Sequence, residues 1–385
     1  MQGNFRLAVV DGFSGGGRYS KGEMGSPLVF LDVLGRTMSE IDIKRAADGF
    51  KPLEYECYFL FNDENPSTTK LLDANVAPLL AELREKHPNL TIIVHSESRP
   101  FSALYPAAKA KLEAAGMRNV IFNIDQCGDV GVDRATIVDI LQTFNSAEVF
   151  VTFMIESLLA YLSAKDSGAL QKRLAHLDLP SSDLEELRVV MNRREWLSTA
   201  ERIVFDQWAS VSPFVSPFSI HNPDGWRYWL MHFAKSPRAR QVYNDVLHAN
   251  ANSQAHFGRA GLDMFSFDPK HEGALYLFDF DGRARAREQL FEDVPRTISG
   301  FGDAITVSDF QHQIYSRTPA HSDDIRSAIF NNPDVEVLTP SGNPRRSELR
   351  LRPDDVLRVA RQRSMFKFDW PTGSRKPDRD PSSGG

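Results

Sequence analysis

The sequence predicts an α/β protein in which a mostly parallel β-sheet is covered by helices on both faces. Short apolar runs recur along the first half of the chain, and each is followed by a segment with helical spacing of apolar residues. The runs are almost continuously apolar, as expected of parallel strands that are buried on both sides. A turn-rich basic segment near the C-terminus predicts a separate small module.

The alternation of strand and helix is typical of a Rossmann-like domain. The predicted strands lie at 7–10, 55–61, 90–94, 119–124 and 148–154. The predicted helices lie at 27–38, 69–85, 104–116 and 133–144. We place the N-terminal part of this domain at 1–155. A strand at 227–234 and a helix at 236–249 indicate that 216–300 completes it.

Other segments depart from this alternation. Between 156 and 215, apolar residues at three- and four-residue spacing predict a helical insertion that caps the domain. A helix at 322–330 followed by a β-hairpin at 335–352, around the turn-rich sequence PSGNPRR, indicates a winged-helix-like module over 301–370. Residues 371–385 are rich in Pro, Gly, Ser and charge, which predicts a disordered tail.

The charge of the chain is unevenly distributed. The 385 residues carry a net charge of −6, whereas 341–385 holds 11 Lys and Arg against 6 Asp and Glu. A basic end on an acidic body indicates an anionic partner such as nucleic acid. We expect the arginines of the predicted hairpin to contact phosphates, with an ordinary solvated hairpin as the equal alternative. They are Arg345, Arg346, Arg350 and Arg352.

Cysteine and histidine usage limits the chemistry. Two cysteines, Cys57 and Cys127, exclude a disulfide framework and an all-cysteine metal site within this chain. This usage fits a reducing compartment, and no apolar run approaches the roughly 18 residues of a membrane span. The histidines show no metal-binding spacing. We therefore expect a cytoplasmic protein with no metal and no membrane contact.

The segment after the first predicted strand is the strongest functional signal. It begins with an acid and continues as a small-residue loop: Asp11, Gly12, Phe13, Ser14, Gly15, Gly16 and Gly17. The loop lies at the carboxyl edge of the predicted sheet, where such folds bind ligands, and glycines let backbone N–H groups approach a ligand. The acid disfavours a pyrophosphate and favours a ligand with an amino group and hydroxyls. We therefore expect Asp11, Phe13 and the glycines to bind S-adenosylmethionine; the alternative is a flexible glycine-rich turn.

Acidic residues also follow the second and fourth predicted strands. Asp63 and Glu64 would accept hydrogen bonds from ribose hydroxyls, with a polar turn as the equal alternative. Asp125 lies beside the glycine loop, and we expect it to position the reacting group; a helix cap is the alternative. Cys127 is a weaker candidate for a nucleophile, because a small buried thiol is the commoner role.

Several segments, taken in order, resemble the three-Cys-motif partner (TcmP) proteins. They are VVDGFSGGGRY followed by GEMGSPL, IFNIDQCGDVGV, EVFVTFMIESLLAYL and YWLMHFAKSPRARQVYNDVLH, and the resemblance spans about residues 5–365. It implies a fold like that of class I S-adenosylmethionine-dependent methyltransferases. It also implies a partner, a radical-SAM-like protein with a three-cysteine motif.

One departure from the family concerns the loop after the fourth strand. The family's loop tends to read Asp-Pro-aromatic-Gly, whereas this chain has Asp125, Gln126, Cys127 and Gly128. The groups that would hold an amino target are therefore missing. Three functions stay open: a methyltransferase acting on or with nucleic acid, a non-catalytic subunit of a radical-SAM-like or nucleic-acid-processing complex, and a Mg²⁺-dependent nuclease. The nuclease would use a carboxylate cluster of Asp11, Asp63 and Asp125.

Overall fold

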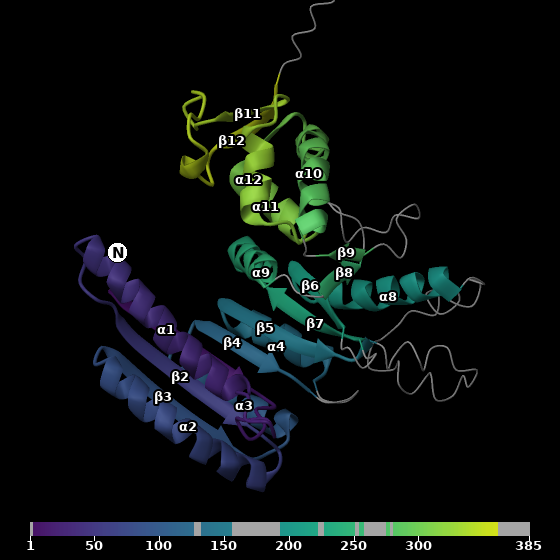
Figure 1. Cartoon of the computed structure of the whole chain (residues 1–385). Helices are drawn as coiled ribbons and strands as arrows, with labels where there is room; N and C mark the ends of the chain where they lie inside the picture. The colour runs from purple at the N-terminus through teal and green to yellow at the C-terminus, as the bar shows by residue number, and fades with distance from the viewer. Residues whose placement is uncertain are drawn as a thin grey trace, which may run out of the picture.

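The computed structural model describes residues 3–126, 132–155, 193–221, 227–250, 254–257, 275–277 and 280–360 (Figure 1). Most of the predicted helical insertion, 156–192, and the predicted tail, 371–385, lie outside these residues. The described residues form an α/β domain and a smaller C-terminal module.

The described part of the α/β domain is built on a nine-stranded sheet in the order β3-β2-β1-β4-β5-β7-β6-β8-β9. Five strands run parallel: β1 (Asn4–Asp11), β2 (Glu54–Asn62), β3 (Leu90–Glu97), β4 (Asn119–Ile124) and β5 (Ser146–Phe153). The antiparallel additions are β6 (Phe214–His221), β7 (Arg227–Ala234), β8 (Gln254–Phe257) and β9 (Leu275–Leu277). The predicted α/β class and Rossmann-like sheet are confirmed, with all five predicted parallel strands in place.

The first antiparallel strand next to the parallel half of the sheet is β7. β7 pairs antiparallel with both β5 and β6, so β6 runs in the same direction as β5. The strand predicted at 227–234 is therefore present, but it does not extend the parallel half of the sheet.

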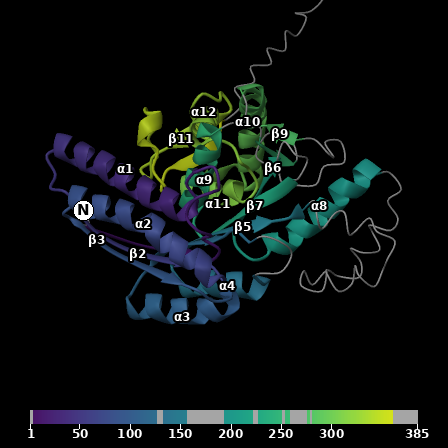
Figure 2. The same cartoon turned by 60° about the horizontal axis from the view of Figure 1, so that its bottom comes forward.

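Helices cover both faces of the sheet (Figure 2). Side chains alternate between the faces along each strand, so neighbouring residues of β1 enter different cores. Val9 packs among side chains of the helices on one face, and Val10 among those on the other. The first face carries α1 (Ser26–Ala47) and α2 (Pro66–Lys86), and the second carries α3 (Phe101–Ala114) and α4 (Arg134–Thr143).

Two further helices flank the antiparallel strands on opposite faces. Trp208 of α8 contacts Phe233, whereas Tyr243 of α9 contacts His232, the preceding residue of β7. No helix among the described residues is both long enough and apolar enough to cross a membrane. The bounds of these two helices are Arg193–Ala209 for α8 and Pro237–Ala249 for α9.

The C-terminal module combines helices with a three-stranded antiparallel sheet ordered β10-β12-β11. The short helix predicted at 322–330 is α12, with those bounds. The second strand of the predicted hairpin is wrong, because β11 pairs with 356–359 and not with 347–352. The elements, in order, are α10 (Phe280–Gly300), β10 (Ala304–Thr306), α11 (Val307–Tyr315), α12 (Ser322–Phe330), β11 (Val335–Leu338), the 3₁₀ turn η2 (Glu348–Arg350) and β12 (Val356–Val359).

Helix α10 contributes to the cores of both parts of the protein. Its residues Leu290, Val294 and Ile298 pack in one core with Phe310 and Ile329 of the module. Its Ala286, nearer the start of the helix, lies in the core of the α/β domain. The predicted boundary at 300 therefore stays a prediction, and α10 connects the two parts.

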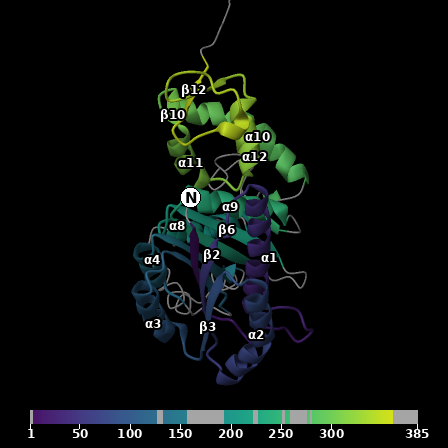
Figure 3. The same cartoon turned by 90° about the vertical axis from the view of Figure 1, so that its left-hand side faces the viewer.

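The module packs against the edge of the large sheet where the parallel strands begin. Its core includes Phe214, the first residue of β6, and Ala234, the last residue of β7. Ala234 is paired with Glu148, close to the start of β5. Figure 3 shows the N-terminus, which marks the start of β1, on the side of the sheet nearest the module.

Two buried polar side chains of α9, Asn244 and His248, form a polar row that hydrogen-bonds to the module and joins it to the α/β domain. Asn244 Nδ2 donates to the carbonyl oxygens of Thr318 and Ala320 at 3.0 and 3.3 Å. One turn further along, His248 Nε2 lies 3.0 Å from the carbonyl oxygen of Pro319. Burial lowers the pKa of His248 to about 4, so its imidazole is neutral at pH 7. These bonds satisfy buried carbonyl groups of the segment between α11 and α12, and Arg240 Nη2 of α9 also donates to the carbonyl oxygen of Thr318, at 3.4 Å.

Candidate functional site at the carboxyl edge of the sheet

Asp11 ends β1 with a fully buried carboxylate. Ser26 Oγ donates to its Oδ2 at 2.6 Å, and Asn123 Nδ2 donates to its Oδ1 at 3.2 Å. The backbone N–H of Phe13 donates to Oδ1 at 3.4 Å. Burial raises the pKa of Asp11 to about 6, against the lowering effect of these hydrogen bonds, and the charge of Asp125 adds to the rise. Asp11 therefore ties β1 to the start of α1 and to β4, and its carboxylate is closed to a ligand.

The loop after Asp11 is braced by the neighbouring strand. Ser14 N donates to the carbonyl oxygen of Asn62 at 2.7 Å, and Asn62 N donates to Ser14 Oγ at 2.8 Å. The side-chain amide of Asn62 donates to the carbonyl oxygens of Gly12 and Arg99, both at 3.0 Å. Because Asn62 is buried and bonds to both segments, it fixes the loop relative to β2 and to the segment leading into α3.

The glycines of the loop have different roles. A β-carbon at Gly12 would lie 2.5 Å from Cδ2 of Phe101, whose ring stacks on Phe13 with centroids 5.7 Å apart. Gly15 and Gly17 have φ of 60° and 79°, which an L side chain rarely adopts. A β-carbon at Gly17 would contact α2, whereas no atom lies within 4 Å of one at Gly15. The backbone at Gly15 is therefore open to an approaching ligand.

Asp125, one residue beyond β4, is an exposed carboxylate at the same edge. Thr152 Oγ1 of β5 donates to Asp125 Oδ1 at 2.6 Å. Tyr228 of β7 lies at the same edge, because the next residue, Trp229, pairs with Phe153 at the end of β5. Burial and then the charges of Asp125 and Tyr19 raise the pKa of the Tyr228 phenol. Three strands thus bring together a carboxylate, a hydroxyl and a phenol. This arrangement can accept a hydrogen bond from an amino or hydroxyl group of a substrate and orient it.

Gln126 bonds to the start of the next described segment. Its Oε1 accepts a hydrogen bond from Val132 N at 3.0 Å. Cys127, the weaker candidate for a nucleophile, lies outside the described residues.

Asp63 and Glu64 follow β2 at this edge and differ in availability. Asp63 Oδ1 accepts a hydrogen bond from Asn65 N at 2.9 Å. Asn65 in turn caps α2 by accepting from Ser67 N at 2.9 Å. Asp63 therefore shapes the turn before α2, whereas the Glu64 side chain is exposed. Of the two acids, Glu64 is the one presented to a ligand.

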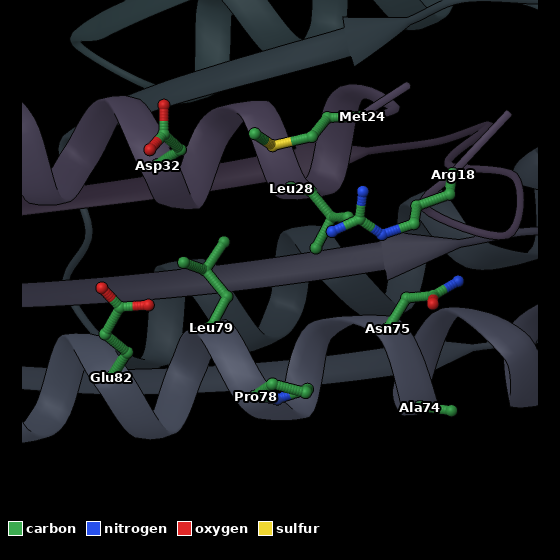
Figure 4. A pocket seen from close by; sticks show the side chains of 9 residues that line it. All are labelled: Arg18, Met24, Leu28, Asp32, Ala74, Asn75, Pro78, Leu79 and Glu82. Atoms are coloured by element: carbon green, nitrogen blue, oxygen red, sulfur yellow. The ribbon is translucent and has the colours of Figure 1, made fainter. Parts of the chain in front are cut away.

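A separate hollow of about 300 Å³ lies on the other side of the glycine loop, between α1 and α2 (Figure 4). Asn75 Nδ2 donates to the carbonyl oxygen of Gly16 at 2.7 Å, so the loop is tied to its wall. The hollow runs along the two helices and not at the strand ends, so it is not the site that the glycines predicted. It has an apolar middle and charged ends, formed by Leu28, Leu79, Pro78, Asp32, Glu82 and Arg18.

The carboxylates at this edge do not form a metal site. Within the described ranges, no group of three or more His, Cys, Asp or Glu side chains is arranged to hold a metal ion. Asp11 is enclosed by its hydrogen bonds, and Asp63 bonds within its own turn. The cluster of Asp11, Asp63 and Asp125 that a nuclease would need is therefore not brought together.

The arginines predicted to contact phosphates lie on the C-terminal module. Arg345 is committed to the buried carboxylate of Asp355: its Nε donates to Oδ2 at 2.9 Å, and its Nη2 pairs with Oδ1. Arg346, Arg350 and Arg352 are exposed. The module packs where the parallel strands begin and the site lies where they end, so the eight residues of β5, about 26 Å, separate them.

Four polar residues that shape the site were not predicted as site residues: Ser26, Asn62, Asn123 and Thr152. Ser26 lies in the Gly-Ser-Pro segment that contributed to the family resemblance, and its side chain makes no capping hydrogen bond in its own helix. Asn62 is the last residue of β2 and Asn123 the last but one of β4, and each directly follows a buried phenylalanine. A polar residue at the end of a buried strand is thus the signal that would have found them, because it must be paired there.

The fold defines an α/β protein with a Rossmann-like sheet, and the candidate site lies at the carboxyl edge of its parallel strands. No protein-family model, curated protein or solved structure matches this chain.

Proposed function

We propose that the chain is a TcmP-like protein with a methyltransferase-like fold that binds S-adenosylmethionine at the carboxyl edge of its sheet. The observation that carries the proposal is the strand order β3-β2-β1-β4-β5-β7-β6 with β7 antiparallel, the arrangement of class I methyltransferases. The open backbone at Gly15, next to exposed carboxylates on two strand ends, fits a ligand with an amino group and ribose hydroxyls.

Each residue has a role in this proposal. Gly15, Gly16 and Gly17 present backbone to the methionine end, and Phe13 forms an apolar wall beside them. Glu64 accepts hydrogen bonds from the ribose, while Asp63 holds the turn that carries it. Asp11 acts through the loop that it holds. These loop and turn residues bind and orient the cofactor.

When bound, S-adenosylmethionine supplies an electrophilic methyl group. Asp125 accepts a hydrogen bond from the amino or hydroxyl group of the acceptor and so directs its lone pair, and Thr152 fixes the carboxylate for this task. Placing the two reacting groups in one geometry supplies much of the rate of such a transfer.

The acceptor side of the proposal is nucleic acid. The order α10, β10, α11, α12, β11, β12 and the sheet β10-β12-β11 support a winged-helix-like arrangement of the C-terminal module. Such a module, with exposed Arg346, Arg350 and Arg352, supports an activity on or with nucleic acid.

A second candidate is a non-catalytic partner subunit of a radical-SAM-like or nucleic-acid-processing complex. The enclosure of Asp11 favours it, because a carboxylate with all its oxygens bonded inside the fold contributes to stability without a ligand. The departure at Gln126 and Cys127 favours it as well.

Calorimetric titration with S-adenosylmethionine and S-adenosylhomocysteine tests the proposal. We expect micromolar binding to the unaltered protein and at least tenfold weaker binding to Glu64→Ala. The matched control is Glu113→Ala, an equally exposed acid on α3, which should bind as the unaltered protein does. A folded protein that releases no heat with either compound would overturn the cofactor site and leave the partner subunit.

A further inference from the structure

The helix α12, which follows α11 in the winged-helix-like module, is committed to contacts inside the molecule. Arg283 and Arg287 of α10 both pair with its Asp324, with N–O distances of 2.7 Å. Asp245 of α9 accepts from Ser322 N at 2.8 Å and from Ser322 Oγ at 2.7 Å. The exposed acid of α12, Asp323, would repel a phosphate backbone. This helix is therefore not presented to a nucleic acid.

The loop between β11 and β12, residues 339–355, is in contrast built to stand out from the module. The buried Asp355 anchors one end of it by pairing with Arg345 and by accepting from Arg352 N at 2.8 Å. Arg345 N donates to the carbonyl oxygen of Val337, and Gly342 makes the turn with φ of 81°. The loop is thus held in one shape before it meets a partner.

This anchored loop exposes an apolar side chain among arginines. Leu349, in the 3₁₀ turn, has 86% of its surface exposed, the highest value among the large apolar residues described. Arg346, Arg350 and Arg352, which lie close to Leu349 in the sequence, are exposed as well. Leu349 is not part of the core of the module, so the anchored loop offers a partner an apolar contact with arginines on both sides of it in sequence.

We propose that the 339–355 loop contacts double-stranded nucleic acid, with Arg346, Arg350 and Arg352 on phosphates and Leu349 as an apolar wedge in a groove. Proteins that bind grooves use this combination of arginine and an inserted aliphatic side chain. A phosphate surface alone would explain the arginines but not the leucine. The role of Arg345 is structural, since it keeps the loop in shape.

The charges of the module limit the strength of this contact. Residues 280–360 hold 11 Arg against 13 Asp and Glu, a net charge of −2, and Glu348 and Asp354 lie in the loop itself. The net charge of the module therefore does not attract nucleic acid. The salt dependence of binding must come from the three exposed arginines of the loop. Three phosphate contacts give a slope of log affinity against log salt of about −2.7.

Fluorescence anisotropy with a labelled 20-base-pair DNA duplex and the same sequence as RNA tests the proposal. We expect a salt slope between about −2 and −3, which falls toward zero when Arg346, Arg350 and Arg352 are all changed to Ala. Leu349→Ala should weaken binding by about tenfold and leave the slope unchanged, since it contacts no phosphate. The DNA and RNA arms show which groove the loop fits.

The controls separate this contact from general basicity and from misfolding. Arg285→Ala removes an exposed arginine of α10 and should leave the affinity unchanged. All substituted residues are exposed, and thermal unfolding confirms that each variant is folded. The proposal would be overturned if the protein did not bind the duplex. It would also be overturned if neither the triple arginine variant nor Leu349→Ala changed the affinity. The outcome is independent of the titration with S-adenosylmethionine, so either proposal can fail alone.

Discussion

Burial decides what each acidic residue at the carboxyl edge does. Asp11 ends β1 and Asp125 directly follows the neighbouring β4, and the charge of Asp125 adds to the raised pKa of Asp11. Asp11 is fully enclosed and has its hydrogen bonds inside the fold, whereas Asp125 is exposed and bonds to Thr152. The enclosed acid holds the loop in place, and the exposed one is accessible to a ligand.

Replacing Asp11 by Asn should make stability less dependent on pH. The pKa of Asp11 is about 6 in the folded protein and about 4 in an unfolded chain, so the folded state binds the proton more tightly. Ionisation of Asp11 therefore lowers the free energy of unfolding as pH rises through this window, by on the order of 2–3 kcal/mol. Asp11→Asn should lack this loss, because its amide does not ionise.

Urea unfolding of both proteins at pH 3.5 and pH 8 measures the effect. The quantity to compare is the difference in free energy of unfolding between the two proteins at each pH. The contributions of the other titrating groups cancel in this difference. Stability that changes equally with pH in both proteins would show that Asp11 is not buried as described.

At the scale of elements, a strand was predictable where a run of apolar residues in the sequence marks it. The five parallel strands are continuous apolar runs, and α12 starts and ends where its apolar spacing does. The direction of β7 was not predictable, since an apolar run looks the same in either direction. The second strand of the C-terminal hairpin was misplaced because Leu349 and Leu351 alternate with polar residues as a strand would, while Val356–Val359 makes the pairing.

The candidate site was predictable only in part, because its position comes from local sequence and its geometry from distant contacts. The glycine loop and Asp125 follow apolar runs, and this placed them at one edge. The enclosure of Asp11 depends on Ser26 and on Asn123, which is 112 residues away along the chain. No spacing rule connects such residues. Only the fold therefore shows that Asp11 supports the loop, whereas the sequence predicted that it binds a ligand.

The polar row of α9 should weaken in acid through His248. Its pKa is about 4 when folded and about 6.5 when unfolded, so the unfolded chain binds the proton first. The stability that neutral His248 contributes is complete above pH 6.5 and is lost as pH falls toward 4, by about 3 kcal/mol. His248→Gln should keep a donor near Pro319 and lose less stability over this range.

Thermal unfolding at pH 7 and pH 4.5 compares this variant with the unaltered protein. The control is His312→Gln on the exposed side of α11, which should follow the unaltered protein. A His248→Gln profile parallel to that of the control would contradict a buried neutral imidazole at the contact.

At the scale of the whole molecule, the two parts share a core and should unfold together. Phe214 and Ala234 of the large sheet lie in the core of the C-terminal module. Hydrogen exchange should therefore give amides of α12 and of β4 the same free energy of opening. Asn244→Ala, which removes the side-chain donor that bonds to the buried carbonyls of Thr318 and Ala320, should lower both by about 1–3 kcal/mol. Exchange of α12 at a clearly lower free energy than β4 would show an independent module instead.

The placement of the module at the start of the strands also sets a minimum size for what the protein can engage. A molecule that touches both the exposed arginines and Asp125 must extend over at least the length of β5, about 26 Å. A duplex rises about 3.4 Å per base pair, so fewer than about eight base pairs cannot reach both. Under the proposals above, the contacts of α9 with the module thus require a nucleic acid of at least this length for simultaneous contact with both places, whatever its base sequence.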